Sequence, residues 1–308
     1  MSSRPYLLVF AILCLSACVS FPDAPPATVQ PLLLEDQFIA ADGTRLGLQQ
    51  WEANEPRAVI VALHGMNDYS EAFAGPAAWW AAEAGITTYA IDQRGFGRSP
   101  QFGRWVGRET LKADLRAAID AARTAHPATP VFALGHSMGG AIILAAEADA
   151  RLNADGIILA APAVWGGPAL PVLYRISANI AAFFAPGKTL TGERAGRQST
   201  DNIEALRAMA VDERVIKETR IDAVLGVTRA MGEGYRATED VEADVLLLIG
   251  EKDEIIPIKT MANAADRIRR VSVVRYDDGW HLLFRDLQRE RVWRDVADWI
   301  TDRSASSF

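Results

Sequence analysis

The sequence predicts an α/β protein, with a mostly parallel central sheet, helices on both faces of the sheet and a helical cap inserted late in the chain. Short, continuously apolar runs alternate with longer amphipathic runs over most of the 308 residues. This alternation is typical of parallel strands joined by helical crossovers. It stops at about residues 162–242, where no strand is expected. A stretch of that length needs structure of its own, so we expect the cap there.

The expected elements follow from local patterns along the chain. "QFIAADGTRLGLQQW" places Asp42-Gly43 between alternating apolar residues, which predicts a hairpin turn. Continuous apolar runs predict strands buried on both faces, and amphipathic or alanine-rich runs predict helices, one of them capped at Gly85. The strand runs are "AVIVALHG", "ITTYAID", "VFALGHS", "GIILAAP", "VLLLIG" and "VSVVRYD". The helix runs are "EAFAGPAAWWAAEAG", "ETLKADLRAAIDAARTAHP", "MGGAIILAAEADA", "KTMANAADRIRR" and "RVWRDVADWITDR", with "LPVLYRISANIAAFFAPG", "IEALRAMA" and "IKETRIDAVLGVTRAMGEG" in the cap.

Length alone would allow one large domain or two small ones, and the order of the expected elements favours one domain at residues 36–308 that contains the cap. Composition indicates that a full core can be buried. Half of the residues are hydrophobic and the formal net charge is −7. No basic patch is available to neutralise phosphates, which argues against a nucleic-acid partner. No grouping of His, Asp and Glu has the spacing of metal ligands, and no cofactor is expected.

The N-terminus has the layout of a secretory signal peptide. Arg4 precedes an apolar run from Tyr6 to Leu15, and small residues follow. The run is too short for a transmembrane helix, which needs about 20 apolar residues. The next residues, "LSAC", resemble the lipobox of bacterial lipoproteins. That resemblance implies a signal peptide at 1–17 and acylation of Cys18, and the Pro-rich stretch 18–35 is expected to be a tether.

This processing decides what becomes of the two cysteines. We expect Cys14 to be removed with the signal peptide and Cys18 to carry lipid, which would leave the mature chain with neither a thiol nor a disulfide. Several acyl chains anchor a protein firmly, so we expect a membrane partner. In the Gram-negative lipoproteins that this segment resembles, an aspartate after the cysteine retains the protein at the inner membrane. Val19 stands there, so we expect the bacterial cell envelope and its outer membrane.

Ser137 stands where a predicted strand turns directly into a predicted helix. The stretch 135–139, "GHSMG", fits the G-x-S-x-G nucleophile elbow in the strand–turn–helix context that this motif requires. A sharp turn leaves no room for side chains on either side of the serine, which explains the flanking glycines. We expect Ser137 to project at the carboxyl end of the sheet.

A serine nucleophile needs a base that is itself oriented by an acid. His281, in "DDGWHLLF", lies between the last predicted strand and the last helix and is the candidate base. His126 is expected at the surface, and His64 is expected to form local hydrogen bonds that shape a loop. His136 precedes the serine, and we expect its side chain to point away from the pocket in a structural role.

The acid is expected after the strand run "VLLLIG". Asp253 occupies that place, with Glu251 and Glu254 as weaker candidates, and the chain order serine, acid, histidine is the one expected of this arrangement. Acyl transfer also needs donors for a developing oxyanion. One is expected to be the N–H of Met138, and the other the N–H of Met66 in the loop after "VALHG".

The motifs together resemble one branch of a known superfamily. "HGMNDYS", "DQRGFGRS", "GHSMGG", "GEKDEIIP" and "GWH" stand in the order and spacing of the monoacylglycerol lipase-like, or lysophospholipase-like, α/β-hydrolases. The similarity runs from about Gln37 to Arg303. It implies an α/β-hydrolase fold with a helical cap, in which many members have histidine where Gln93 stands. Carried over by position, it implies the nucleophile, acid, base and oxyanion donors Ser137, Asp253, His281, Met66 and Met138.

The function expected from these residues is serine-dependent hydrolysis of a carboxylic ester. The resemblance implies a small-molecule acyl ester substrate, such as a monoacylglycerol or a lysophospholipid. Two alternatives stay open: a peptidase or amidase on the same scaffold, and a non-catalytic envelope lipoprotein that binds a partner through the cap.

The cap run "LPVLYRISANIAAFFAPG" carries apolar residues at near-helical spacing. One interpretation is a helix packed on the sheet domain. The other is that one face, with Phe183 and Phe184, lines an acyl-binding pocket or touches lipid.

Overall fold

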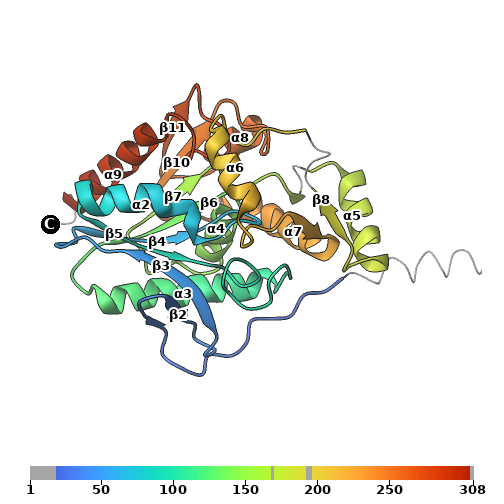
Figure 1. Cartoon of the computed structure of the whole chain (residues 1–308), viewed down its shortest axis with the longest axis horizontal. Coiled ribbons are helices and arrows are strands. Elements are labelled where there is room, and N and C mark those ends of the chain that lie inside the picture. Colours follow the sequence, from blue (N-terminus) through green and yellow to red (C-terminus); the bar gives the residue numbers. More distant parts are fainter. Residues whose placement is uncertain (1–18, 168–169, 192–195, 306–308) are drawn as a thin grey trace, which may run out of the picture.

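The computed structural model describes residues 19–167, 170–191 and 196–305, and within them one twisted sheet forms the centre of the molecule (Figure 1). Its described part has nine strands in the order β1-β2-β3-β5-β4-β6-β7-β10-β11. The strands are β1 Leu32–Leu33, β2 Gln37–Ile39, β3 Arg45–Trp51, β5 Ile86–Ile91, β4 Ala58–Leu63, β6 Val131–His136, β7 Gly156–Ala160, β10 Val245–Gly250 and β11 Val271–Tyr276.

The sheet is parallel from β5 to β11 and antiparallel at its β1–β3 edge. The register pairs Leu63 of β4 with Ile91 on one side and Gly135 on the other, so these strands end at one edge of the sheet. Every residue of β4, β6, β7 and β10 is buried, as their continuous apolar runs predict. The predicted mostly parallel sheet is confirmed.

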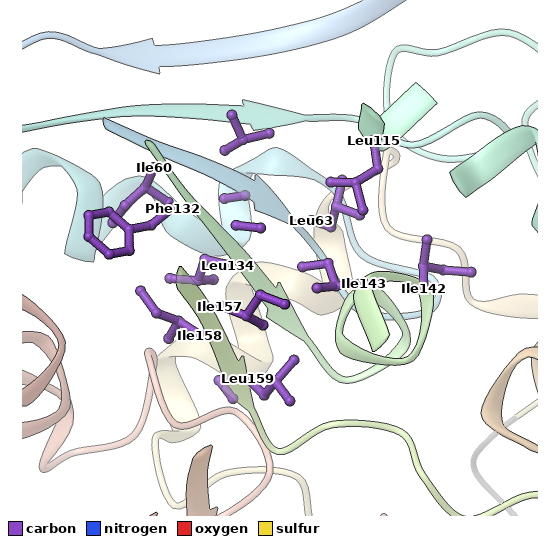
Figure 2. Close-up of a cluster of buried hydrophobic side chains, with 14 of the residues drawn as sticks. Ile60, Leu63, Leu115, Phe132, Leu134, Ile142, Ile143, Ile157, Ile158 and Leu159 are labelled. Carbon is purple, nitrogen blue, oxygen red and sulfur yellow. The ribbon is translucent and has the colours of Figure 1, made fainter. Parts of the chain in front are cut away.

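Helices cover both faces of the sheet. Figure 1 shows α3 on one side and α2 with α9 on the other, and contacts pair α3 with α4 and α2 with α9. Figure 2 shows the apolar side chains that meet between the strands and helices, among them Phe132 of β6, Leu115 of α3 and Ile143 of α4. The elements are the 3₁₀ turn η1 Ser70–Phe73, α2 Ala74–Trp79, the π-helical turn η2 Trp80–Ala84, α3 Arg108–Ala125, α4 Met138–Asp149, α8 Ile258–Ala265 and α9 Arg289–Ala305.

Two turn predictions are confirmed in detail. Asp42 Oδ1 accepts the N–H of Thr44 at 2.9 Å in the hairpin between β2 and β3. Gly85 ends η2 in the left-handed conformation, with φ 66°, which glycine adopts without steric cost. The helix expected before Gly85 is instead three successive turns of different pitch, η1, α2 and η2.

The segment between β7 and β10 contains helices α5 Val172–Phe184, α6 Ile203–Val211 and α7 Ile221–Ala237. It also contains a small antiparallel sheet of β8 Thr189–Thr191 and β9 Glu218–Arg220. The expectation of no strand in this region was therefore wrong. All three residues of β8 are exposed and β9 is polar, so neither strand leaves an apolar run in the sequence.

Helix α7 holds this inserted segment on the sheet domain by packing along α4. The two helices approach closely at Gly234, which has no side chain. A Cβ atom added there would lie only 2.9 Å from the Cα of Ala141. Helix α5 packs in turn on α7, at the far end of the molecule from the C-terminus (Figure 1). The insertion therefore has a fixed inner helix, α7, and an outer helix, α5.

The described chain begins at Val19, so the predicted signal peptide and Cys18 lie outside it. The segment that follows runs along the domain. Phe21 packs edge-on against Trp105, with ring centroids 6.4 Å apart, and the N–H groups of Thr28 and Val29 both bond to the carbonyl oxygen of Ala41. In the part of the chain that the structure describes, no helix has the length and apolar character needed to cross a membrane.

Candidate active site

Ser137 occupies a strained turn at the carboxyl end of β6. Its backbone has φ 51° and ψ −112°, an uncommon conformation for a residue with a side chain. A Cβ on Gly135 would lie 2.5 Å from the carbonyl carbon of Gly139, and one on Gly139 would lie 2.3 Å from the Leu63 oxygen. Both distances are too short for any side chain, so the two glycines of the motif are required by packing.

Three side chains from distant parts of the chain meet at this turn. His281 Nε2 lies 3.0 Å from Ser137 Oγ, and His281 Nδ1 lies 2.8 Å from Asp253 Oδ2. Because an ionised carboxylate only accepts hydrogen bonds, Nδ1 carries the proton and Nε2 accepts the serine hydroxyl. All three residues are buried, and the geometry is that of a nucleophile, a base and an orienting acid.

Asp253 is fixed by the turn that follows β10. Its Oδ1 accepts the N–H groups of Ile255 at 2.7 Å and Ile256 at 2.9 Å, which leaves Oδ2 for the imidazole. The two weaker candidates have other partners. Glu251 pairs with Arg275 at 3.0 Å, and Glu254 accepts the N–H of Gln198 at 2.7 Å. Of the three candidate acids, Asp253 is therefore the one whose carboxylate bonds to His281.

The loop that carries His281 is held by a buried carboxylate that sequence reasoning missed. Asp286 is fully buried; its Oδ2 accepts the Trp280 N–H at 2.7 Å, and its Oδ1 accepts the Thr200 hydroxyl at 2.6 Å. Burial raises the pKa of Asp286 to about 6. The only sequence signal was a polar residue five positions after His281. Thr200 belongs to the insertion, so the insertion and the His281 loop are joined here.

His136 lies against His281, with ring centroids 5.0 Å apart. Its Nε2 donates to the carbonyl oxygen of His281 at 3.0 Å, so it supports the backbone of the candidate base. Burial lowers the pKa of His136 to about 3, which keeps the ring neutral. The structural role agrees with expectation, but the expected direction of the side chain was wrong, since His136 contributes to the wall of the cavity around Ser137.

The other two histidines bond away from Ser137. His64 Nδ1 donates to the Gly65 carbonyl at 2.7 Å and its Nε2 accepts the Gln93 N–H at 2.9 Å, as expected of a loop-shaping residue. The Gln93 side chain donates back to the His64 carbonyl at 2.8 Å. Burial lowers the pKa of His64, so it stays neutral. His126 is half-buried rather than a surface residue, with Nε2 2.8 Å from the Tyr89 hydroxyl.

The two residues expected to supply oxyanion donors both lie near the nucleophile. Met138 is the first residue of α4, where backbone N–H groups have no acceptor within the helix. Met66 lines the same cavity as Ser137, in the loop after β4. The insertion holds that loop: Asn67 accepts the Ile216 N–H at 2.9 Å and donates to Thr219 Oγ1 at 2.7 Å.

A cavity of about 720 Å³ opens above Ser137 and His281. One wall comes from the sheet domain and includes the loop with Met66 and the turn with Ile255. The other comes from the insertion. Its apolar part is formed by Leu206, Met209, Ala210, Val215 and Ile216, and its polar part includes Ser199, Lys217 and Thr219. Thr191 of β8 and Glu218 of β9 contribute polar groups. The arrangement can hold an apolar chain with a polar group beside it.

Phe183 and Phe184 do not line this cavity, so the acyl-pocket role predicted for them was wrong. Both lie on α5 and are 49% and 75% exposed. Helix α5 faces α7 with its alanines and leaves its large apolar residues outward. The insertion does supply the apolar wall, but from α6 and the segment after it. Periodicity marks a helix as amphipathic without telling what its apolar face meets.

Within the described ranges, no three His, Cys, Asp or Glu side chains are grouped so that they could hold a metal ion.

An open, mostly parallel sheet with a serine elbow, a histidine and an aspartate at its carboxyl edge defines an α/β-hydrolase. The sequence model of the family Hydrolase_4, described as serine aminopeptidase, S33, matches residues 54–288. The match spans well over half of the chain, and the chain belongs to this family.

Individual relatives agree with this assignment. The chain is similar to a monoacylglycerol lipase of Mycolicibacterium smegmatis, with 30% identity over 277 residues that cover 86% of this chain and 96% of the relative. It is similar to human monoglyceride lipase, with 23% identity over 92% of this chain and 96% of the relative. The crystal structure of Paleococcus ferrophilus monoacylglycerol lipase superposes with a TM-score of 0.71 at 21% identity, over 84% of this chain and 99% of that one. At this identity, the superposition shows that the two chains share a fold and shows nothing further.

Proposed function

We propose that this hydrolase cleaves acyl esters of small lipids, such as monoacylglycerols or lysophospholipids, with Ser137 as the nucleophile. The observation that carries the proposal is the continuous bonded series Ser137–His281–Asp253 beneath a cavity whose wall has an apolar part on the insertion. The relatives named as monoacylglycerol and monoglyceride lipases support the substrate class.

In the proposed reaction Ser137 Oγ attacks the ester carbonyl carbon while His281 Nε2 takes the hydroxyl proton. The tetrahedral intermediate collapses as His281 returns that proton to the leaving alcohol, and an acyl-enzyme remains. Water then attacks the acyl-enzyme carbonyl carbon while His281 Nε2 takes a proton from it. The bond between the acyl carbon and Ser137 Oγ breaks as His281 returns this proton to Oγ, and the fatty acid leaves. Asp253 holds the imidazole tautomer and offsets its positive charge during both steps.

The developing oxyanion would be bound by the N–H groups of Met66 and Met138. Removing one such donor in other enzymes costs about 2.7–4 kcal/mol of transition-state stabilisation. The bonds between the insertion and Asn67 support the Met66 side of this site. The acyl chain of the substrate would lie against Leu206 and its neighbours on the insertion, because apolar chains bind where they displace water from apolar walls.

The proposal is tested by labelling the purified protein with a fluorophosphonate probe and comparing Ser137→Ala. We expect labelling of the parent protein and none of the variant. A series of esters of increasing acyl length then measures the preference of the cavity. An unlabelled parent protein would instead favour the non-catalytic lipoprotein.

Amide hydrolysis is the second candidate, because the family is described as serine aminopeptidase. The same triad can attack either carbonyl group. Aminoacyl-arylamides measured beside acyl esters separate the two. Turnover of arylamides without turnover of esters would replace the ester hydrolase by a peptidase.

We also propose that the enzyme is anchored through acylated Cys18 in the bacterial cell envelope, at the outer membrane. The support is the "LSAC" stretch after an apolar run and the valine that follows it. The outward apolar face of α5, including Phe183 and Phe184, would then touch lipid rather than line the acyl pocket.

A further inference from the structure

A second cavity, of about 380 Å³, lies between α5 and α7 and is lined by four arginines. They are Arg108, Arg175, Arg229 and Arg236, and Glu233 is the one carboxylate among the lining residues. The chain as a whole carries a net charge of −7, so this positive cluster is local and runs against the overall charge.

The arginines differ in how they are paired. Arg108 contacts Glu233 and pairs with Glu109 at 3.2 Å, and the neighbouring Lys112 pairs with Glu109, Asp149 and Glu233, so these two cations are balanced by carboxylates. Arg175 donates to the carbonyl oxygen of Gly167 at 3.3 Å, which is a neutral acceptor. In the described ranges, neither Arg175 nor Arg236 is in an ion pair. The cavity therefore keeps a positive potential suited to an anion.

The start of the described chain lies beside this cavity. Arg229 donates to the carbonyl oxygen of Val19, and the Arg229 guanidinium lies 5.7 Å above the ring of Phe21. Val19 itself packs with Ala182, Ile221 and Leu225 of α5 and α7. Figure 1 shows the N-terminal segment reaching the end of the molecule where α5 and α7 meet.

Helix α5 carries an apolar face next to the cavity. Its alanines pack toward α7, and helical spacing places its large apolar residues on the opposite face. Arg175 lies at the border between the two faces. An apolar face flanked by arginine is typical of helices that lie in a membrane interface. The exposed apolar residues of α5 are Val172, Leu173, Tyr174, Ile176, Ile180, Phe183 and Phe184.

We propose that the cavity between α5 and α7 binds the phosphate of an anionic phospholipid headgroup while α5 lies on the bilayer. The proposal rests on the proposed anchoring at Cys18. Guanidinium groups match phosphate oxygens in shape and charge, and the bilayer that holds the acyl chains supplies the phosphate. Because β8 follows α5 directly and its Thr191 lines the Ser137 cavity, this contact would hold the catalytic opening near the membrane.

The test uses the full-length, lipidated protein with Ser137→Ala, which removes turnover of the lipids. Leu173→Cys on α5 carries a polarity-sensitive dye, and nitroxide-labelled lipid is the quencher. Vesicles of phosphatidylcholine are compared with vesicles that also contain phosphatidylglycerol. We expect phosphatidylglycerol to increase quenching several-fold. The same dye at Leu287→Cys, an exposed site outside α5, should be quenched in neither vesicle.

Three variants then locate the effect. Arg175→Gln with Arg236→Gln should abolish the response to phosphatidylglycerol, and Arg291→Gln with Arg294→Gln on α9 should retain it. Thr228→Trp fills the cavity with every arginine in place and should also abolish the response. Thermal unfolding of each variant checks that the fold is intact.

The outcomes separate the proposals. A response that survives Thr228→Trp would reduce the arginines to a diffuse surface charge and overturn the site. So would a response erased by inorganic phosphate at matched ionic strength, which marks a site for free anions, or no response in a parent protein that does float with the vesicles. Failure of the protein to float with vesicles of either kind would count against the anchor at Cys18 and not against the cavity.

Discussion

His281 is held at three points, and each constrains a different property of the ring. Asp253 fixes the proton on Nδ1, the Ser137 hydroxyl occupies Nε2, and His136 bonds the carbonyl oxygen of His281 itself. Because His136 is buried and its pKa is lowered to about 3, it stays neutral and adds no charge beside the imidazolium that forms in the reaction. Asp286 fixes the preceding peptide through the Trp280 N–H.

Asp253→Asn is expected to lower kcat/KM for a soluble butyrate ester by about 10⁴-fold, because the amide favours the wrong imidazole tautomer while geometry is kept. The matched control is Glu254→Gln, next in the chain, where the amide can still accept the Gln198 N–H. That variant should stay within about threefold of the parent enzyme. Comparable losses in both would show that His281 does not depend on Asp253.

Asp286 predicts a pH dependence of stability. Burial raises its pKa from 3.8 to about 6, so the folded state holds this proton more tightly than the unfolded state. The resulting stability is present below about pH 4 and is lost as pH rises through about 6, a change of about 3 kcal/mol. An asparagine side chain in place of Asp286 cannot ionise and so escapes this loss.

The unfolding temperature of Asp286→Asn relative to the parent protein should therefore rise between about pH 4 and pH 7. Thermal unfolding at several pH values measures it, and Asp277→Asn, at an exposed site, should give a flat difference. A flat difference for Asp286→Asn as well would mean that the buried carboxyl group keeps an ordinary pKa.

At the scale of elements, helices α5 and α6 of the insertion face different surroundings. Helix α6 faces the Ser137 cavity through Leu206 and Met209, whereas α5 turns its apolar face outward. Covering the apolar face of such a helix is stabilising. In the proposed function the acyl chain of the substrate would cover α6, whereas α5 would need another surface. The acyl-length preference should therefore respond to α6.

Leu206→Trp is expected to shorten the acyl chain that the cavity accepts. Displacing three or four methylene groups, at about 0.8 kcal/mol each, should lower kcat/KM for a decanoate ester by about 60- to 200-fold. An acetate ester should change by less than about threefold. Val211→Trp, on the exposed end of the same helix, is the control. Equal losses on both esters would place the acyl chain elsewhere.

Across the whole molecule, what the sequence could predict depended on how local the determining contacts are. The elbow at Ser137 and the strands β4, β6, β7 and β10 were predictable, because close glycine packing and full burial leave local patterns. The pair β8–β9 was not, because exposed three-residue strands are defined only by bonds across the insertion. Phe183 and Leu206 are equally apolar, and only the tertiary arrangement decides which one meets the cavity. Asp286 was missed for the same reason.

The orientation of the molecule on a membrane depends on whether Cys18 is acylated. The lipobox-like residues predict that Cys18, and not Cys14, becomes the N-terminal residue of the mature chain. Cys18→Ser should then abolish incorporation of radiolabelled palmitate, and Cys14→Ser should leave it unchanged, because Cys14 lies in the part that is removed. Envelope fractionation of the two variants gives the location. Palmitate in the Cys18→Ser product would show that the lipid is attached at another residue. The contacts of Val19 and Phe21 with α7 would then reflect packing of the chain alone.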